Sequence, residues 1–149
     1  MLNTSPTTND ENWMKIIGIK REKIPVLIIG NNPIEMTSIY NLLIGIRSKD
    51  YLADVCFNVK DSFERISKTK PAVVLIDDNL VLDDINKFVR VMKQNSKTKQ
   101  IKIIVLKSSN WNYNVIDHVD DYILKETVKA NVLDRLIKNN LNPLIHQLA

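Results

Sequence analysis

Residues 71–80 read PAVVLIDDNL and carry the strongest indication of architecture in the chain. An apolar run from Ala72 to Ile76 is bounded by a proline on one side and by two carboxylates, Asp77 and Asp78, on the other. Such an uninterrupted run is typical of a strand buried on both faces, which means a parallel sheet covered by helices. In these sheets the functional side chains lie just beyond the carboxyl ends of the strands. The sequence therefore places Asp77 where a functional carboxylate is expected.

Strand and helix patterns alternate on both sides of this stretch. After residues 26–30, a helix start is indicated by Asn32 as N-cap, Pro33 at the first helical position and Glu35 at the third. The alternation predicts an α/β fold, a doubly wound five-stranded parallel sheet with helices on both faces. We expect strands at 26–30, 51–59, 72–77, 101–107 and 121–125, and helices at 33–46, 61–68, 83–95 and 127–139, the second opened by Asp61 with Glu64. The crossover between 107 and 125 is short, so its helix is expected to be reduced or irregular.

Composition and length indicate one globular domain. The chain has 149 residues, of which 44% are hydrophobic and 26% charged, as in ordinary soluble proteins. We expect the domain to cover residues 25–140, preceded by a disordered tail (1–11) and an N-terminal extension (12–24). A C-terminal tail follows at 141–149.

Several functional classes are disfavoured. The single cysteine, Cys56, lies in an apolar run and excludes a disulfide framework within the chain, which fits a cytoplasmic protein. The N-terminus does not resemble a secretory signal, and no apolar stretch is long enough to span a membrane. A net charge of +4 comes from dispersed lysines, which argues against nucleic-acid binding. His118 and His146 have no zinc-ligand spacing.

Polar residues follow the predicted strand ends and are expected to share one crevice. These are Gly30-Asn31 after the first strand, Asp77 and Asn79 after the third, Lys107-Ser108 after the fourth and Lys125 at the end of the fifth. The other acids nearby, Asp78, Asp83 and Asp84, are expected on a solvated loop and at the start of the following helix.

The order of these residues resembles the response regulator receiver domain, the CheY-like fold of two-component signalling, over about residues 24–140. VLIIGNNP, VVLIDDNL and DDYILK are similar to its first, acceptor-bearing and last strands. The resemblance implies strand order 2-1-3-4-5, Asp77 as phosphoryl acceptor and Lys125 as a contact to the phosphoryl oxygens. Tyr122 would be the aromatic switch residue, and Mg²⁺ ligands would come from Asn31, Asp77 and the carbonyl of Asn79.

The chain also departs from the family pattern. Gly30 and Asn31 stand where the family has an acidic pair, so Mg²⁺ binding is expected to be weak or absent. Lys107 stands at the position of the family's hydroxyl residue, which leaves Ser108 as its substitute. Our hypothesis is that Lys107 and Lys125 both pair with Asp77, lower its pKa and balance its charge without metal.

These departures favour a stand-alone pseudo-receiver that is not an enzyme, has no cofactor and acts through protein–protein interaction. The expected partner is a histidine kinase or another signalling protein, or a second copy in a homodimer. Trp111, Tyr113 and Tyr122 are the expected partner surface. Two alternatives stay open: a phosphorylation-competent receiver switched at Asp77, with Mg²⁺ only in that case, and a small flavodoxin-like nucleotide or flavin binder.

Overall fold

The structure is a computed structural model that describes residues 22–47, 50–108 and 116–141. Predictions for residues 1–11, most of 12–24, Trp111, Tyr113 and 142–149 lie outside these residues. The strands are β1 (Ile24–Ile29), β2 (Tyr51–Cys56), β3 (Val73–Asp77), β4 (Lys102–Lys107) and β5 (Asp121–Leu124). The helices are α2 (Pro33–Arg47), α3 (Val59–Thr69), α4 (Leu82–Gln94), the short 3₁₀ helix η1 (Lys125–Thr127) and α5 (Ala130–Leu141).

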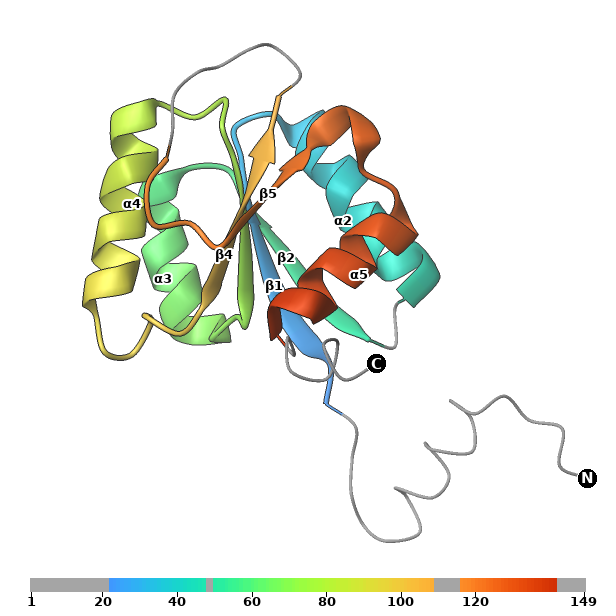
Figure 1. Ribbon diagram of the computed structural model, residues 1–149, viewed down its shortest axis with the longest axis horizontal. Coiled ribbons are helices and arrows are strands. Elements are labelled where there is room, and N and C mark those ends of the chain that lie inside the picture. Colours follow the sequence, from blue (N-terminus) through green and yellow to red (C-terminus); the bar gives the residue numbers. More distant parts are fainter. Residues whose placement is uncertain (1–21, 48–49, 109–115, 142–149) are drawn as a thin grey trace, which may run out of the picture.

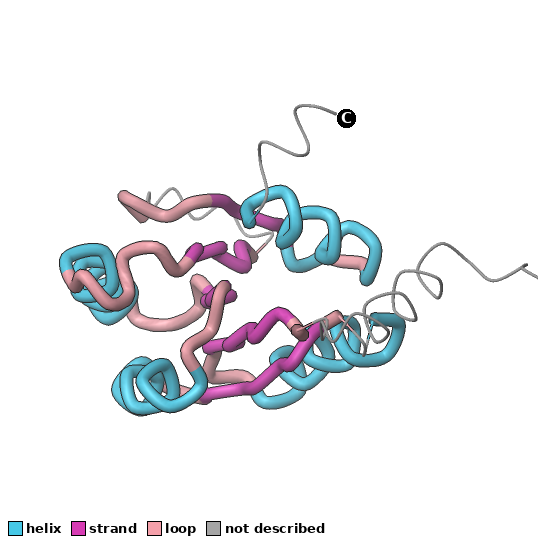
Figure 2. The backbone as a smooth tube through the Cα atoms, turned by 90° about the horizontal axis from the view of Figure 1, so that it is seen from below, coloured by secondary structure: helices cyan, strands magenta, loops and turns pink. Residues whose placement is uncertain are grey.

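The five strands form one parallel sheet in the order β2-β1-β3-β4-β5, as predicted. Helices α2 and α5 cover one face, and α3 and α4 cover the other (Figure 1). Figure 2 shows the same layers from below, with the strands between the two pairs of helices. The α/β fold class is therefore confirmed.

Two hydrophobic clusters fill the space between the sheet and its two helix layers. The central strand β3 is buried along its whole length, including Asp77 at its carboxyl end. Its register pairs Ile29 of β1 with Ile76 and Leu106 of β4 with Asp77. The carboxylate thus lies at the edge where β1, β3 and β4 end together. Among the described residues, no helix is long and apolar enough to cross a membrane.

The helix starts follow local hydrogen bonding. Asn32 caps α2 as predicted, because its side-chain oxygen accepts from the backbone N–H groups of Ile34 and Glu35 at 3.0 and 3.2 Å. The prediction that Asp61 opens the next helix is wrong. Asn58 is the N-cap of α3 and accepts from the N–H of Asp61 at 2.7 Å, so the helix begins earlier.

The crossover from β4 to β5 contains no helix within residues 116–120. A buried Ile116 packs into the core there, and the Asp120 carboxylate accepts from the Lys93 ammonium and from the backbone N–H of Ile103, both at 2.8 Å. These bonds attach the crossover to α4 and β4 without a helix of its own.

A polar clasp joins the start of β2 to α5. The Tyr51 hydroxyl donates to the Asp134 carboxylate at 2.6 Å. Next to it, the Lys138 ammonium bonds to the carboxylates of Asp50 at 3.0 Å and Asp134 at 3.1 Å. Residues from distant parts of the sequence therefore close this edge of the sheet.

Candidate functional site

Asp77 is the centre of the candidate site, and it is fully buried. Its side chain is 0% exposed, yet both carboxylate oxygens have hydrogen-bond partners. The Lys125 ammonium lies 3.1 Å from Oδ1 and 3.2 Å from Oδ2, and the backbone N–H of Asn79 donates to Oδ1 at 2.9 Å. The predicted pairing of Asp77 with Lys125 is confirmed. It links the end of β3 to the residue directly after β5.

A second carboxylate reaches the same lysine. Glu35 Oε2 lies 3.1 Å from the Lys125 ammonium, so the lysine bridges the end of β3 and the first turn of α2. From the sequence, Glu35 is expected only to be part of the helix start, and its contact with Lys125 is not predicted. Its position in the first turn after β1 was the available signal, because that turn opens at the carboxyl edge of the sheet.

Burial dominates the electrostatics of Asp77. Loss of solvation raises the pKa of Asp77 above the ordinary carboxyl value, and nearby Glu35 adds to the rise. The hydrogen bonds from Asn79 and Lys125 act in the opposite direction and offset only part of it. The pairing with Lys125 does lower the pKa of Asp77, as expected, but the net shift is upward because desolvation outweighs the ion pair.

Lys125 is held in its charged form. Burial lowers the pKa of Lys125, but hydrogen bonds to Asp77 and Glu35 outweigh that effect and leave the pKa above the ordinary lysine value. The side chain is only 13% exposed, so the ammonium is shielded from water while it contacts two carboxylates. The result is a fixed internal cation beside the buried acid.

Lys107 does not supply a second cation to Asp77, contrary to our hypothesis. No ion pair joins the two residues, and the Lys107 ammonium lies 5.8 Å from the ring centroid of Tyr122. Tyr122 itself is 40% exposed, and its hydroxyl donates to the carbonyl of Ile116 at 2.7 Å. The Tyr122 hydroxyl is thus bonded to the β4–β5 crossover, and within the part of the chain that the structure describes the cation paired with Asp77 is Lys125.

The neighbouring Asp78 is a structural residue, not the solvated loop acid that we expected. It is half-buried, and its carboxylate accepts from the backbone N–H of Ser108 at 3.1 and 3.2 Å. Ser108 is therefore placed one residue beyond β4 with its main chain fixed to the end of β3. Asp83 and Asp84 do lie exposed in the first turn of α4, as predicted.

The end of β1 has a close contact that the sequence did not predict. In the parallel register Gly30 comes directly after Ile29 and thus lies beside Asp77. A Cβ atom at Gly30 would overlap Sδ of the buried Met36 and lie 2.9 Å from its Cγ. The Met36 side chain would therefore have to move to admit an acidic side chain at this position.

The donor set does not fit the Mg²⁺ ion that the resemblance implies. Asn31 is exposed and offers a neutral amide, Gly30 offers no side chain, and the oxygens of Asp77 are already bonded. Mg²⁺ requires an octahedral set of hard oxygen ligands, usually including carboxylates. Among the described residues, no group of three or more His, Cys, Asp or Glu side chains is arranged to hold a metal.

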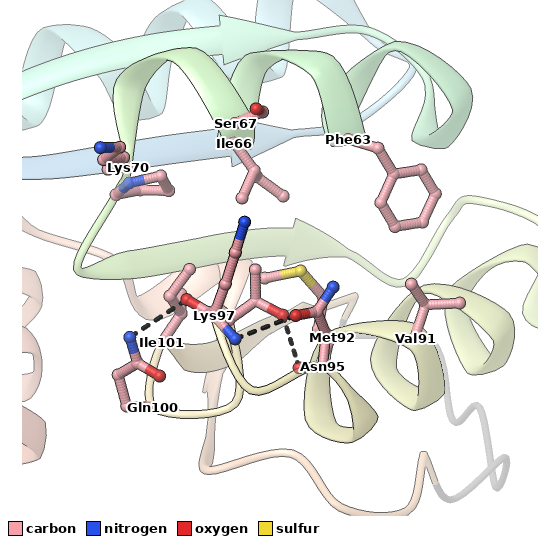
Figure 3. A pocket seen from close by; sticks show the side chains of 12 residues that line it. Phe63, Ile66, Ser67, Lys70, Val91, Met92, Asn95, Lys97, Gln100 and Ile101 are labelled. Atoms are coloured by element: carbon pink, nitrogen blue, oxygen red, sulfur yellow. Dashed lines mark hydrogen bonds between the residues drawn. The ribbon is translucent and has the colours of Figure 1, made fainter.

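A cavity between α3 and α4 is separate from this site. It has a volume of about 630 Å³ (Figure 3). Pro71 and Ile101, which precede β3 and β4, are part of its wall, so it opens at the amino edge of the sheet. Its lining contains lysines but no acid and no histidine, and it therefore offers neither a metal site nor an acid–base pair.

Comparison with known proteins identifies the fold. No protein-family model matches the chain, and no curated protein matches it in sequence. A putative response regulator from Chloroflexus aurantiacus is similar in structure, with a TM-score of 0.70 and 19% identity over 80% of this chain and 98% of the other.

Two further structures are similar to the same degree. The receiver domain of a sensor histidine kinase from Pseudomonas aeruginosa, with a magnesium ion coordinated in its active site cleft, has a TM-score of 0.67 and 19% identity over 79% of this chain and 97% of the other. The chemotaxis response regulator CheY4 of Vibrio cholerae has a TM-score of 0.66 and 12% identity over 80% and 99%. The fold of this protein is therefore the CheY-like fold of response regulator receiver domains.

Proposed function

We propose that this protein is a receiver-like domain of two-component signalling that works by binding protein partners, with its acceptor site held closed by its own lysine. The observation that carries this proposal is the contact of Lys125 with both oxygens of the fully buried Asp77. The domain acts as a signalling module and not as an enzyme.

The chemistry of phosphoryl transfer supports this proposal. Transfer to a carboxylate needs an oxygen that the phosphoryl group can reach and a metal ion that neutralises charge on the phosphoryl oxygens. Asp77 is fully buried and paired with the Lys125 ammonium, and the residues at the end of β1 are a poor ligand set. Asp77, Lys125 and Ser108 are thus the receiver-site positions of this chain, retained in a form that does not favour transfer.

Exposed apolar side chains at the carboxyl edge support a partner-binding role. Ile34, Phe57 and Val81 follow β1, β2 and β3 and are 83%, 47% and 65% exposed, and Leu124 at the end of β5 is also exposed. Exposed groups of this kind are typical of protein-binding surfaces. The partner is a histidine kinase, another signalling protein or a second copy of the chain, and exposed Tyr122 belongs to the proposed surface.

A phosphorylation-competent receiver is the second candidate, because Glu35 brings another carboxylate to the site. Amide NMR spectra during titration with Mg²⁺ and then beryllofluoride separate the two functions, with the Asp77→Asn variant as control. We expect no saturable shift at the ends of β1, β3 and β5. A saturable shift that Asp77→Asn abolishes would establish the working switch. In a separate titration with a nucleotide or a flavin, chemical-shift changes would favour the flavodoxin-like alternative.

A further inference from the structure

Glu35 has a role in this site that helix capping does not explain. Asn32 already accepts from the N–H groups of Ile34 and Glu35, so the first turn of α2 has its cap. The Glu35 carboxylate is bonded instead to the Lys125 ammonium at 3.1 Å. It therefore contacts a residue that lies 90 positions away in the sequence, at the acceptor site.

We propose that Glu35 is a positioning residue that clamps the Lys125 ammonium over Asp77, so that the lysine serves as a built-in counter-ion and keeps divalent cations out. This inference rests on the proposed function and adds the residue that keeps the acceptor closed. Without Glu35, Lys125 would be held by Asp77 alone and would exchange more freely with solvent.

The geometry matches the donor capacity of the lysine. An ammonium group has three N–H donors, and three carboxylate oxygens lie around this one. Two belong to Asp77, at 3.1 and 3.2 Å, and one belongs to Glu35, at 3.1 Å. Charge-assisted bonds of this kind are stronger than neutral ones, so both acids contribute to the position of the ammonium.

The clamp also connects three segments that meet at the carboxyl edge of the sheet. Asp77 is the last residue of β3, Glu35 lies in the first turn of α2, and Lys125 begins η1 just before α5. The Glu35 side chain is 39% exposed and Asp77 is fully buried, so Glu35 is the member of the trio that a partner or solvent reaches first. Release of the lysine is therefore expected to begin at Glu35.

Lysine reactivity tests the clamp directly. Competitive acetylation with trace acetic anhydride, read by peptide mass spectrometry, reports how often each amine is neutral and accessible. We expect Glu35→Gln to raise the acetylation rate of Lys125 more than about twofold, because loss of the Glu35 carboxylate lowers the pKa of the amine and removes one of its hydrogen bonds. Glu64→Gln is the matched control, because Glu64 pairs with Lys68 at 2.9 Å on the exposed face of α3. It should leave Lys125 unchanged.

Two results would overturn the inference. The first is a Lys125 acetylation rate in Glu35→Gln that stays within twofold of wild type. The second is a wild-type rate that rises with Mg²⁺ but does not rise in Glu35→Gln, because Glu35 would then be a metal ligand. The variant Glu35→Asp keeps the carboxylate on a shorter side chain and should give an intermediate acetylation rate of Lys125. It provides a second test if Glu35→Gln does not fold.

The readout separates this inference from the proposed function. The comparison of acetylation rates in metal-free buffer involves neither phosphoryl analogue nor partner, so the clamp is tested even if the beryllofluoride titration reveals a working switch. Conversely, a failed clamp leaves the titration of Asp77 with Mg²⁺ and beryllofluoride as an independent test of the proposed function.

Discussion

Replacement of Lys125 by methionine isolates the charge of the internal cation. Methionine keeps most of the aliphatic volume but removes the ammonium, and it leaves Asp77 buried with only the N–H of Asn79 as partner. A buried carboxylate without a cation is strongly disfavoured, so its pKa rises further and the folded protein takes up a proton. The free energy of unfolding should therefore fall, and the loss should depend on pH.

The free energy needed to protonate Asp77 sets the upper limit of this loss in the free energy of unfolding. At pH 7 the solution is about 3 units above the ordinary aspartate pKa of about 3.9, and each unit costs about 1.4 kcal/mol. The ceiling is thus about 4 kcal/mol at pH 7 and about 1.5 kcal/mol at pH 5. The pKa of Asp77 is higher in the folded protein than in the unfolded chain. The contribution of Asp77 to the free energy of unfolding is therefore retained at pH values near its unfolded pKa and is lost as the pH rises through its folded pKa.

Urea unfolding followed by circular dichroism at pH 5 and pH 7 measures both values. Asp77→Asn combined with Lys125→Met should recover most of the loss, because the uncompensated charge is gone. Lys129→Met, an exposed lysine four residues further along the chain, should change stability by less than about 0.5 kcal/mol. An equal loss at both pH values, or a loss that Asp77→Asn does not relieve, would show that Lys125 does not stabilise the fold through the charge of Asp77.

Two further predictions concern packing and the crossover. Gly30→Asp should lower the free energy of unfolding, measured by thermal unfolding, by about 1–3 kcal/mol, because the new side chain clashes with Met36. Calorimetry should detect no Mg²⁺ binding by this variant, and binding would contradict the close contact at Gly30. Asp120→Ala should lose about 2–3 kcal/mol in urea unfolding, because it leaves the buried N–H of Ile103 unpaired. Asp117→Ala, an exposed neighbour, is its control, and equal losses would count against this assignment.

Much of the fold could be predicted because local signals agree with it. The apolar run before Asp77 marks the central strand, and the Asn32 cap with Pro33 marks the start of α2. These features are predictable because the spacing of apolar residues and the capping of a helix depend only on residues that are close in the sequence. The position of Lys125 next to Asp77 followed from the convergence of strand ends in a parallel sheet.

Other parts of the site could not be predicted from the sequence. The contact of Glu35 with Lys125 and the filling of the Gly30 space by Met36 depend on side-chain directions that no local pattern encodes. The upward net shift in the pKa of Asp77 was not predicted, because the sequence revealed possible cations but not complete burial. Lys107 was misplaced for the same reason, since its partner is the ring of Tyr122.

The clasp between β2 and α5 has a consequence for biosynthesis. Tyr51 bonds to Asp134, and Lys138 bonds to Asp50, across more than 80 positions of the chain. A polypeptide leaves the ribosome amino end first, at about 5–20 residues per second. The clasp can therefore form only several seconds after β2 has been synthesised, when translation has delivered α5. Until then β2 lacks the polar contacts that join its start to α5 in the folded domain.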